Sequence, residues 1–210
     1  MRTAVVLAGG FATRFDGRDK AVVEVAGRPM IRRVVDAVAQ VVDEVVVNAR
    51  TDQRDAIESA LAGRPDYRFA FDDEPDRGPL AGMATGLAAT TTEWSAVVAC
   101  DMPLVDPAFV DYLFSRASDH DAAIPVHRDD GRAWPQPLQA VYRTETVRDR
   151  ARETLAAGGE SPMALLDALD WVGVSLADAP DGVDETTLWN VNTVEDLRAV
   201  EARVARRTGE

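Results

Sequence analysis

The stretch TAVVLAGG, from Thr3 to Gly10, decides the fold of this 210-residue chain. Its apolar run is typical of a β-strand covered on both faces, and the Gly-Gly pair that follows favours a tight turn. Similar runs occur at DEVVVNAR (43–50) and SAVVACDMP (95–103), and helical patterns of roughly 10–15 residues lie between the strands. Strands joined in this way form βαβ units. The sequence therefore predicts an α/β fold: a single Rossmann-like domain with a mostly parallel sheet flanked by helices.

Weaker patterns extend this prediction to the C-terminus. Further strands are expected at 67–73, 121–126, 138–143 and 171–175. Helices are expected at 52–61, from Pro79 onward, and at 107–116, 145–157, 162–169 and 194–207. Another helix is expected to have Pro29 as its first residue, and the strand within 95–103 to end on Asp101. The segment His127–Pro137 is polar and contains prolines, which predicts a loop.

Composition limits the partners of the chain. The formal net charge is −13, from 36 acidic residues, 24 of them aspartate, and 23 basic ones. An acidic surface repels phosphate backbones, so we expect no nucleic-acid partner. Abundant aspartate with scarce lysine favours adaptation to high salt, as in a halophile, over a GC-rich genome, because codon bias alone does not give so large a negative charge. No run approaches the ~18 apolar residues of a membrane span. The single cysteine, Cys100, fits a reducing compartment, so we expect a cytoplasmic protein without membrane contacts.

Flexible and cationic residues follow the first predicted strand, where an open α/β sheet binds its ligands. Gly9 and Gly10 let backbone N–H groups face a ligand without an intervening Cβ. Arg14 and Lys20 add positive charge, and Lys20 is the only lysine of the chain. An ammonium group is a compact charge that can reach phosphate in a tight loop. This segment therefore predicts a site for nucleotide phosphates.

The other predicted strands also end in polar side chains. Asn48 lies at the end of the second, Asp72 and Asp73 at the end of the third, and Asp101 at the end of the fourth. A carboxylate at a strand end is a hard oxygen ligand, suited to Mg²⁺ that is shared with phosphates. We therefore expect these strand ends to converge on a nucleoside triphosphate and Mg²⁺, with Asp101 as the metal ligand.

Other chemistries lack their motifs. The chain has no GxxxxGK[ST], which excludes a P-loop kinase or ATPase, and no GxGxxG after the first strand, which disfavours a dinucleotide oxidoreductase. Cys100 could be read as a nucleophile, but neither histidine lies in a supporting motif. We therefore interpret Cys100 as a small buried residue at a strand end.

Four motifs carry a resemblance to a known family. The pattern LAGG…R…G.DK in residues 7–20 resembles nucleotidyltransferases that transfer a nucleoside monophosphate onto a phosphate acceptor. GPLAGM (78–83), CDMP (100–103) and WNVNTVEDL (189–197) narrow this resemblance to the molybdenum cofactor guanylyltransferases. The matching blocks extend from about residue 3 to 197. The resemblance implies Mg²⁺-dependent transfer of GMP from GTP to the terminal phosphate of molybdopterin, with release of pyrophosphate.

The resemblance also implies roles for single residues. The backbone of the first strand end would contact the guanine nucleotide, and Lys20, Arg14 and Asp101 would be the catalytic groups. Asp72 is preferred to Asp73 for the nucleoside because its distance from GPLAG fits the family better. The nucleotide-binding set is Leu7, Ala8, Gly9, Gly10, Lys20, Asn48, Asp72 and Asp101.

On the acceptor side, Asn190 and Asn192 would face molybdopterin. The single domain, 1–210, would then consist of a nucleotide-binding half (about 1–105) and an acceptor-binding half (about 106–200). Transient partners would be molybdenum enzymes or other cofactor-biosynthesis proteins. Two alternatives stay open. One is a related cytidylyl- or guanylyltransferase acting on molybdopterin or a corrinoid phosphate, and the other is a non-catalytic nucleotide-binding partner in cofactor insertion.

Overall fold

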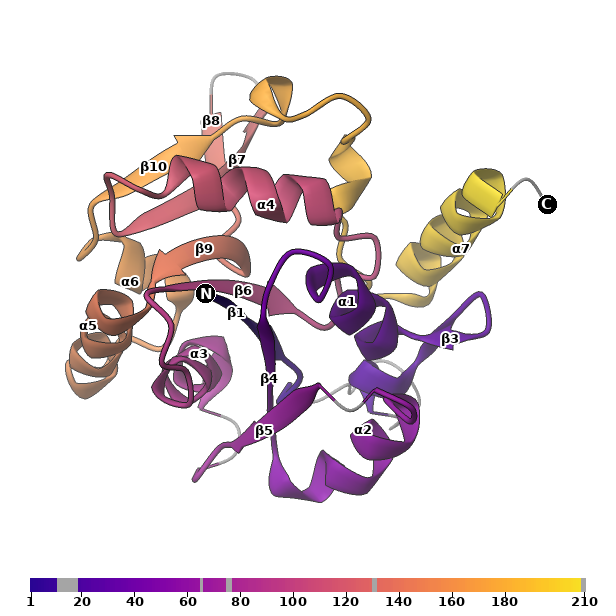
Figure 1. The fold of residues 1–210 in the computed structure, drawn as a ribbon, viewed down its shortest axis with the longest axis horizontal. Helices are drawn as coiled ribbons and strands as arrows, with labels where there is room; N and C mark the ends of the chain where they lie inside the picture. The colour runs from indigo at the N-terminus through magenta and orange to yellow at the C-terminus, as the bar shows by residue number, and fades with distance from the viewer. Residues whose placement is uncertain (11–18, 65, 75–76, 130–131, 209–210) are drawn as a thin grey trace.

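Figure 1 shows the computed structural model of the chain, which describes residues 1–10, 19–64, 66–74, 77–129 and 132–208. Its centre is one mixed sheet with the strand order β10-β7-β9-β6-β1-β4-β5, and β8 pairs with β7 outside this path. The strands are β1 (Arg2–Leu7), β4 (Glu44–Ala49), β5 (Tyr67–Phe71), β6 (Trp94–Ala99), β7 (Ala122–Asp129), β8 (Arg132–Pro135), β9 (Gln139–Arg143) and β10 (Trp171–Val174).

Most of the sheet is parallel. β1 pairs in parallel with β4 and with β6, β4 with β5, and β7 with β10. Only β8 and β9 of this sheet run antiparallel to their neighbours. The predicted α/β fold with a mostly parallel sheet is therefore confirmed.

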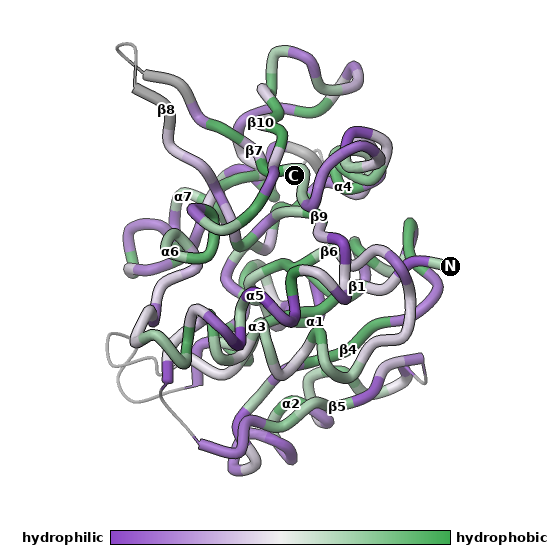
Figure 2. The backbone as a smooth tube through the Cα atoms, turned by 90° about the vertical axis from the view of Figure 1, so that its left-hand side faces the viewer, coloured by the Kyte–Doolittle hydropathy of each residue, from purple (hydrophilic) through white to green (hydrophobic). Residues whose placement is uncertain are grey.

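Helices cover both faces of the sheet. Side chains of α1, α2 and α4 form one apolar core with the sheet, and side chains of α3, α5 and α6 form another on the opposite face (Figure 1). The hydropathy colours of Figure 2 follow this arrangement, since the inner strands are mostly green. The helices are α1 (Met30–Val38), α2 (Arg54–Ala60), α3 (Gly78–Ala88), α4 (Pro107–Arg116), α5 (Thr144–Ala156), α6 (Pro162–Leu166) and α7 (Val194–Thr208).

A small third core lies at one side of the molecule. The short hairpin β2–β3 (Glu24–Val25 and Arg28–Pro29) packs there with α7, around Val25, Met30 and Val200. Short 3₁₀ turns complete the fold: η1 (Lys20–Val22), η2 (Thr51–Gln53), η3 (Leu176–Asp178) and η4 (Glu185–Leu188). Within the described ranges, no helix is long and apolar enough to cross a bilayer.

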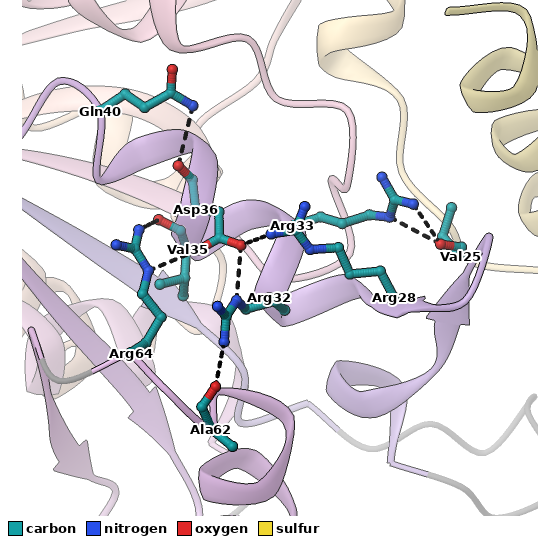
Figure 3. A network of polar contacts seen from close by, with 9 residues as sticks. All are labelled: Val25, Arg28, Arg32, Arg33, Val35, Asp36, Gln40, Ala62 and Arg64. Carbon is teal, nitrogen blue, oxygen red and sulfur yellow. Dashed lines mark hydrogen bonds and ion pairs between the residues drawn. The ribbon is translucent and has the colours of Figure 1, made fainter. Parts of the chain in front are cut away.

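Asp36 on α1 joins this hairpin to the body of the protein (Figure 3). Its carboxylate pairs with Arg32 of the same helix (2.8 Å) and with Arg64, which follows α2 (2.7 Å). Arg28 of the hairpin pairs with the same carboxylate, and Arg32 also donates to the carbonyl of Ala62 (2.9 Å). Polar contacts therefore hold α1, the hairpin and the end of α2 together on this face.

The predicted loop at 127–137 is wrong in part. β7 continues to Asp129, and β8 pairs with it antiparallel, with His127 opposite Trp134 and Val126 opposite Pro135. The polar composition misled the prediction because ladder hydrogen bonds form between backbone groups and do not require apolar side chains. Pro135 is tolerated because β8 pairs on one side only among the described strands.

Some predicted ends were also wrong. β6 ends at Ala99, not Asp101, because the chain turns there: the Met102 N–H donates to the Ala99 carbonyl (3.2 Å). Pro29 is not the first residue of α1 but its N-cap, with extended backbone (ψ 138°), and α6 ends at Leu166. These are shifts of one to three residues at element ends, where periodicity is least informative.

One close approach sets the distance between α3 and the sheet. A Cβ added at Gly86 of α3 would lie 2.3 Å from Cγ1 of Val5 in β1. A side chain of any size at this position would therefore push α3 away from the central strand.

We expect Gly86→Ala to lower the free energy of unfolding by about 1 kcal/mol. Overpacking of this kind costs about 1–3 kcal/mol, which exceeds the ~1 kcal/mol that alanine gains over glycine in a helix. Urea denaturation would measure the change. As a control, Val5→Ala should destabilise the Gly86→Ala variant less than it destabilises the wild type. A Gly86→Ala variant as stable as the wild type would contradict this packing.

Candidate functional site

The carboxyl ends of the parallel strands border a cavity of about 320 Å³. The N-terminal turn of α3 forms another wall, through Gly78, Pro79 and Gly82. The structure brings the whole predicted nucleotide-binding set to this cavity: Leu7, Ala8, Gly9, Gly10, Lys20, Asn48, Asp72 and Asp101.

Strand register explains this convergence. Leu7 of β1 lies beside Asn48 of β4 on one side and Ala99 of β6 on the other. The ladder continues beyond the strand end, since the Ala8 N–H donates to the Asn48 carbonyl (2.8 Å) and the Cys100 N–H to the Leu7 carbonyl (3.0 Å). Three segments far apart in sequence therefore reach the cavity at the same level.

Asn48 and Asp72 form a polar pair on one wall. The Asn48 side-chain amide donates to Oδ1 of Asp72 (2.7 Å) and to the Ala70 carbonyl (3.2 Å), and Asn48 is buried. A Cβ at Gly82 would lie 2.4 Å from Oδ1 of Asn48, and one at Gly9 would lie 2.9 Å from Oδ2 of Asp72. The glycines of GPLAG and LAGG thus let two backbones approach this pair. Asp73, which follows Asp72 in sequence, is exposed and does not line the cavity.

Lys20 and Asp101 form an ion pair that also lines the cavity. Their Nζ and Oδ2 atoms are 2.5 Å apart, and the two side chains are 18% and 15% exposed. The ammonium also donates to Oδ1 of Asn192 (2.7 Å). The Val191 N–H in turn donates to the backbone carbonyl of Asp101 (2.8 Å), which ties the C-terminal segment to this strand end. The pair is therefore held in a partly buried setting where charge is weakly screened.

Asp101 has the features of a ligand for one divalent ion. Its Oδ1 atom is buried and has no hydrogen-bond partner among the described residues. Buried polar atoms are rarely left without a partner, so this oxygen fits a group that arrives with the substrate. No cluster of three His, Cys, Asp or Glu side chains suited to a metal occurs in the described ranges. An ion at Asp101 would therefore take its other ligands from water and phosphate, as Mg²⁺ commonly does.

Cys100 also borders the cavity, but its thiol is poorly suited to nucleophilic chemistry. Burial raises the pKa of this thiol well above its usual value, and the neighbouring Asp101 carboxylate raises it further. The reactive form of a cysteine is the thiolate, which these surroundings disfavour.

The two residues predicted for the acceptor side, Asn190 and Asn192, are not part of the cavity lining. Asn192 contacts Lys20 but does not line the cavity, and Asn190 is partly exposed outside the lining. Arg14 lies outside the described residues.

Sequence reasoning missed several neighbours of the site. Glu74, Arg77 and Leu138 line the cavity, and Arg77 could have been suspected because it directly precedes GPLAG. Behind the cavity, the side chain of Arg50 donates to the Gly9 carbonyl (2.8 Å) and the side chain of Gln53 to the Ala8 carbonyl (2.9 Å). No local motif marks the contact of Gln53 with Ala8, because the two residues are 45 positions apart in sequence.

Comparisons with known proteins show the family of the chain. The family model of the MobA-like NTP transferase domain matches residues 4–203. A relative from Natronomonas pharaonis, named probable molybdenum cofactor guanylyltransferase, is 41% identical over 204 residues, covering 97% of this chain and 98% of its own length. A relative of the same name from Haloferax mediterranei is 40% identical over 207 residues and covers 96% and 94%.

A solved structure has the same fold. Molybdopterin-guanine dinucleotide biosynthesis protein A from Archaeoglobus fulgidus superimposes with a TM-score of 0.79 at 25% identity, covering 98% of this chain and all of that one. The superposition thus extends over nearly the whole chain. With its glycine-rich strand end, its paired Lys20 and Asp101 and a family match over nearly its full length, the chain belongs to the family of MobA-like NTP transferases.

Proposed function

We propose that this protein transfers GMP from GTP to the terminal phosphate of molybdopterin, forming molybdopterin guanine dinucleotide and pyrophosphate. The convergence of the glycine-rich strand end, the Asn48–Asp72 pair and the Lys20–Asp101 pair on one cavity carries this proposal. The names of the full-length relatives support the choice of guanine and of molybdopterin. We place the reaction in the cytoplasm.

In this proposal the two polar pairs of the cavity bind different parts of GTP. Asp72, held in place by Asn48, offers carboxylate oxygens to donor groups of the nucleoside. The backbone of Leu7–Gly10 faces the nucleotide, and the nearby N-terminus of α3 favours negative charge. Lys20 contributes its ammonium group to phosphate binding, and Arg14 contributes its guanidinium group.

The transfer itself requires little covalent work from the protein. A phosphate oxygen of molybdopterin forms a bond to the α-phosphorus of GTP, and the bond from that phosphorus to the bridging oxygen of the β-phosphate breaks. Because the attacking phosphate is already an anion, no strong general base is needed. The contribution of Lys20 and Arg14 is to offset the charge that develops on the α-phosphate and on pyrophosphate.

We propose Asp101 as the ligand of Mg²⁺. When bound, Mg²⁺ supplies positive charge to the phosphate oxygens during the transfer. The Asp101 carboxylate orients Lys20 at the same position, since Oδ2 accepts from the ammonium while Oδ1 has no partner among the described residues. Asn192, with Asn190, is proposed to face the acceptor, and molybdenum enzymes or other biosynthesis proteins are proposed to receive the product.

Nucleotide selectivity can be measured directly by thermal stabilisation. At a hundredfold excess over its Kd, a ligand that binds only the folded state stabilises it by about 2.7 kcal/mol. With Mg²⁺ in concentrated potassium chloride, we expect GTP to raise the melting temperature more than CTP, ATP or UTP. Lys20→Met should remove most of the effect, because it keeps an unbranched side chain of nearly the same length but removes the charge. A larger shift with CTP would favour the cytidylyl alternative, and no shift with any nucleotide would contradict the proposal.

Replacement of Asp101 tests the catalytic assignment. We expect Asp101→Asn to lower the rate of GMP transfer by about 100-fold or more, because it removes the charge that orients Lys20 and holds Mg²⁺. Pyrophosphate release from GTP and molybdopterin is the measurement, with the melting temperature as a check on folding. The matched control is Asp73→Asn, an exposed carboxylate outside the cavity, which should keep full activity. Equal activities of the two variants would refute the assignment of Asp101.

A further inference from the structure

Gln53 lies behind the cavity, and every hydrogen-bonding atom of its side chain has a partner. The side-chain nitrogen donates to the Ala8 carbonyl (2.9 Å) and to Oδ2 of Asp19 (2.6 Å), and the side-chain oxygen accepts from the Arg50 N–H (2.9 Å). Gln53 is only 2% exposed. A buried amide with this many partners has a single orientation, because any rotation leaves polar groups unpaired.

The two groups that accept from this nitrogen belong to two separate segments near the nucleotide site, the end of β1 and the segment before Lys20. Ala8 is part of the glycine-rich strand end, whose register with β4 is fixed by the bond from its N–H to Asn48. Asp19 directly precedes Lys20 and caps the turn η1, since its Oδ1 accepts from the Ala21 N–H (3.0 Å). One nitrogen atom therefore bridges the strand end and the residue before the lysine.

This bridge fixes the backbone position from which the Lys20 side chain extends. Both carboxylate oxygens of Asp19 accept hydrogen bonds, one from the Ala21 N–H and one from Gln53. Because Gln53 also binds the Ala8 carbonyl, Asp19 is fixed relative to the end of β1. Arg50 adds a second contact to the same strand end through the Gly9 carbonyl. The Asp101 and Asn192 contacts then fix the other end of the lysine side chain.

We propose that Gln53 is a positioning residue of the nucleotide site. Its amide holds the backbone of Ala8 and the Asp19–Lys20 segment at the spacing that GTP phosphates require. Only an amide at this position can donate two hydrogen bonds while accepting one, which is the set of contacts observed. The inference rests on the proposed function, because it takes GTP as the ligand of this cavity.

The test replaces the donor without changing the shape of the side chain. Gln53→Glu removes both hydrogens and places a carboxylate against the Asp19 carboxylate and the Ala8 carbonyl. We expect the KM for GTP to rise on the order of tenfold, which corresponds to a loss of about 1.4 kcal/mol of binding free energy when the strand end and Lys20 leave their spacing. Steady-state kinetics would give KM and kcat separately, and the melting temperature without nucleotide would be measured in parallel.

Asp19→Asn provides the rescue. In the double variant the side-chain amide at position 19 can donate to the carboxylate at position 53, which restores a hydrogen bond across the bridge with its direction reversed. The KM of the double variant should therefore be lower than that of Gln53→Glu. Gln40→Glu is the matched control, since Gln40 is exposed on the surface, and it should leave KM unchanged.

The possible outcomes separate the two claims. A Gln53→Glu variant with a lower melting temperature but an unchanged KM would show a purely structural role and overturn the inference. A raised KM that Asp19→Asn does not lower would also overturn it. If Gln53→Glu does not fold, Gln53→Asn, which keeps the amide but shortens its reach, must raise KM. A wild type that neither binds nor turns over GTP would overturn the proposed function, and this inference with it.

Discussion

The parallel pairing of β1 with a neighbour on each side is the constraint on which the site depends. Leu7 lies in register with Asn48 and with Ala99, so three strands end at one level. The backbone bonds that extend each ladder by one residue bring Ala8 and Cys100 to the same edge. A shift of one residue in the pairing of β1 with β4 would turn Asn48 away from the cavity, because side chains alternate between the faces of a sheet.

Glycine then decides how closely the helix layer approaches this edge. Gly86 lets α3 rest on Val5, and Gly82 lets its first turns approach Asn48. The small residues of GPLAGMATG thus serve packing and the site at once. α3 therefore borders the cavity with small residues, while polar groups such as Asn48 and Asp72 come from other elements.

The charges of the site are balanced locally in a protein of net charge −13. The single lysine is paired with Asp101, and among the described residues that line the cavity only Lys20 and Arg77 carry a positive charge. In concentrated salt the Debye length falls to a few ångströms, and distant charges contribute little to binding. Short, partly buried contacts such as those of Lys20 keep their strength under these conditions. The same reasoning favours fixed positions for the binding groups, which the Gln53 amide provides.

The sequence by itself determined the α/β class, the parallel strands and the residues at the strand ends that line the cavity, but not Glu74, Arg77 or Leu138. These features follow from local signals: apolar runs of strand length, helical periodicity between them, and polar residues at strand ends. The polar hairpin β7–β8 was missed because its pairing rests on backbone bonds, which leave no apolar pattern. The ion pair of Lys20 with Asp101, the contact of both with the Asn192 segment and the bridge through Gln53 were decided only by the tertiary structure. Their partners lie 34 to 172 residues apart, and side chains so distant along the chain meet only when the strand register and the helix packing have placed them.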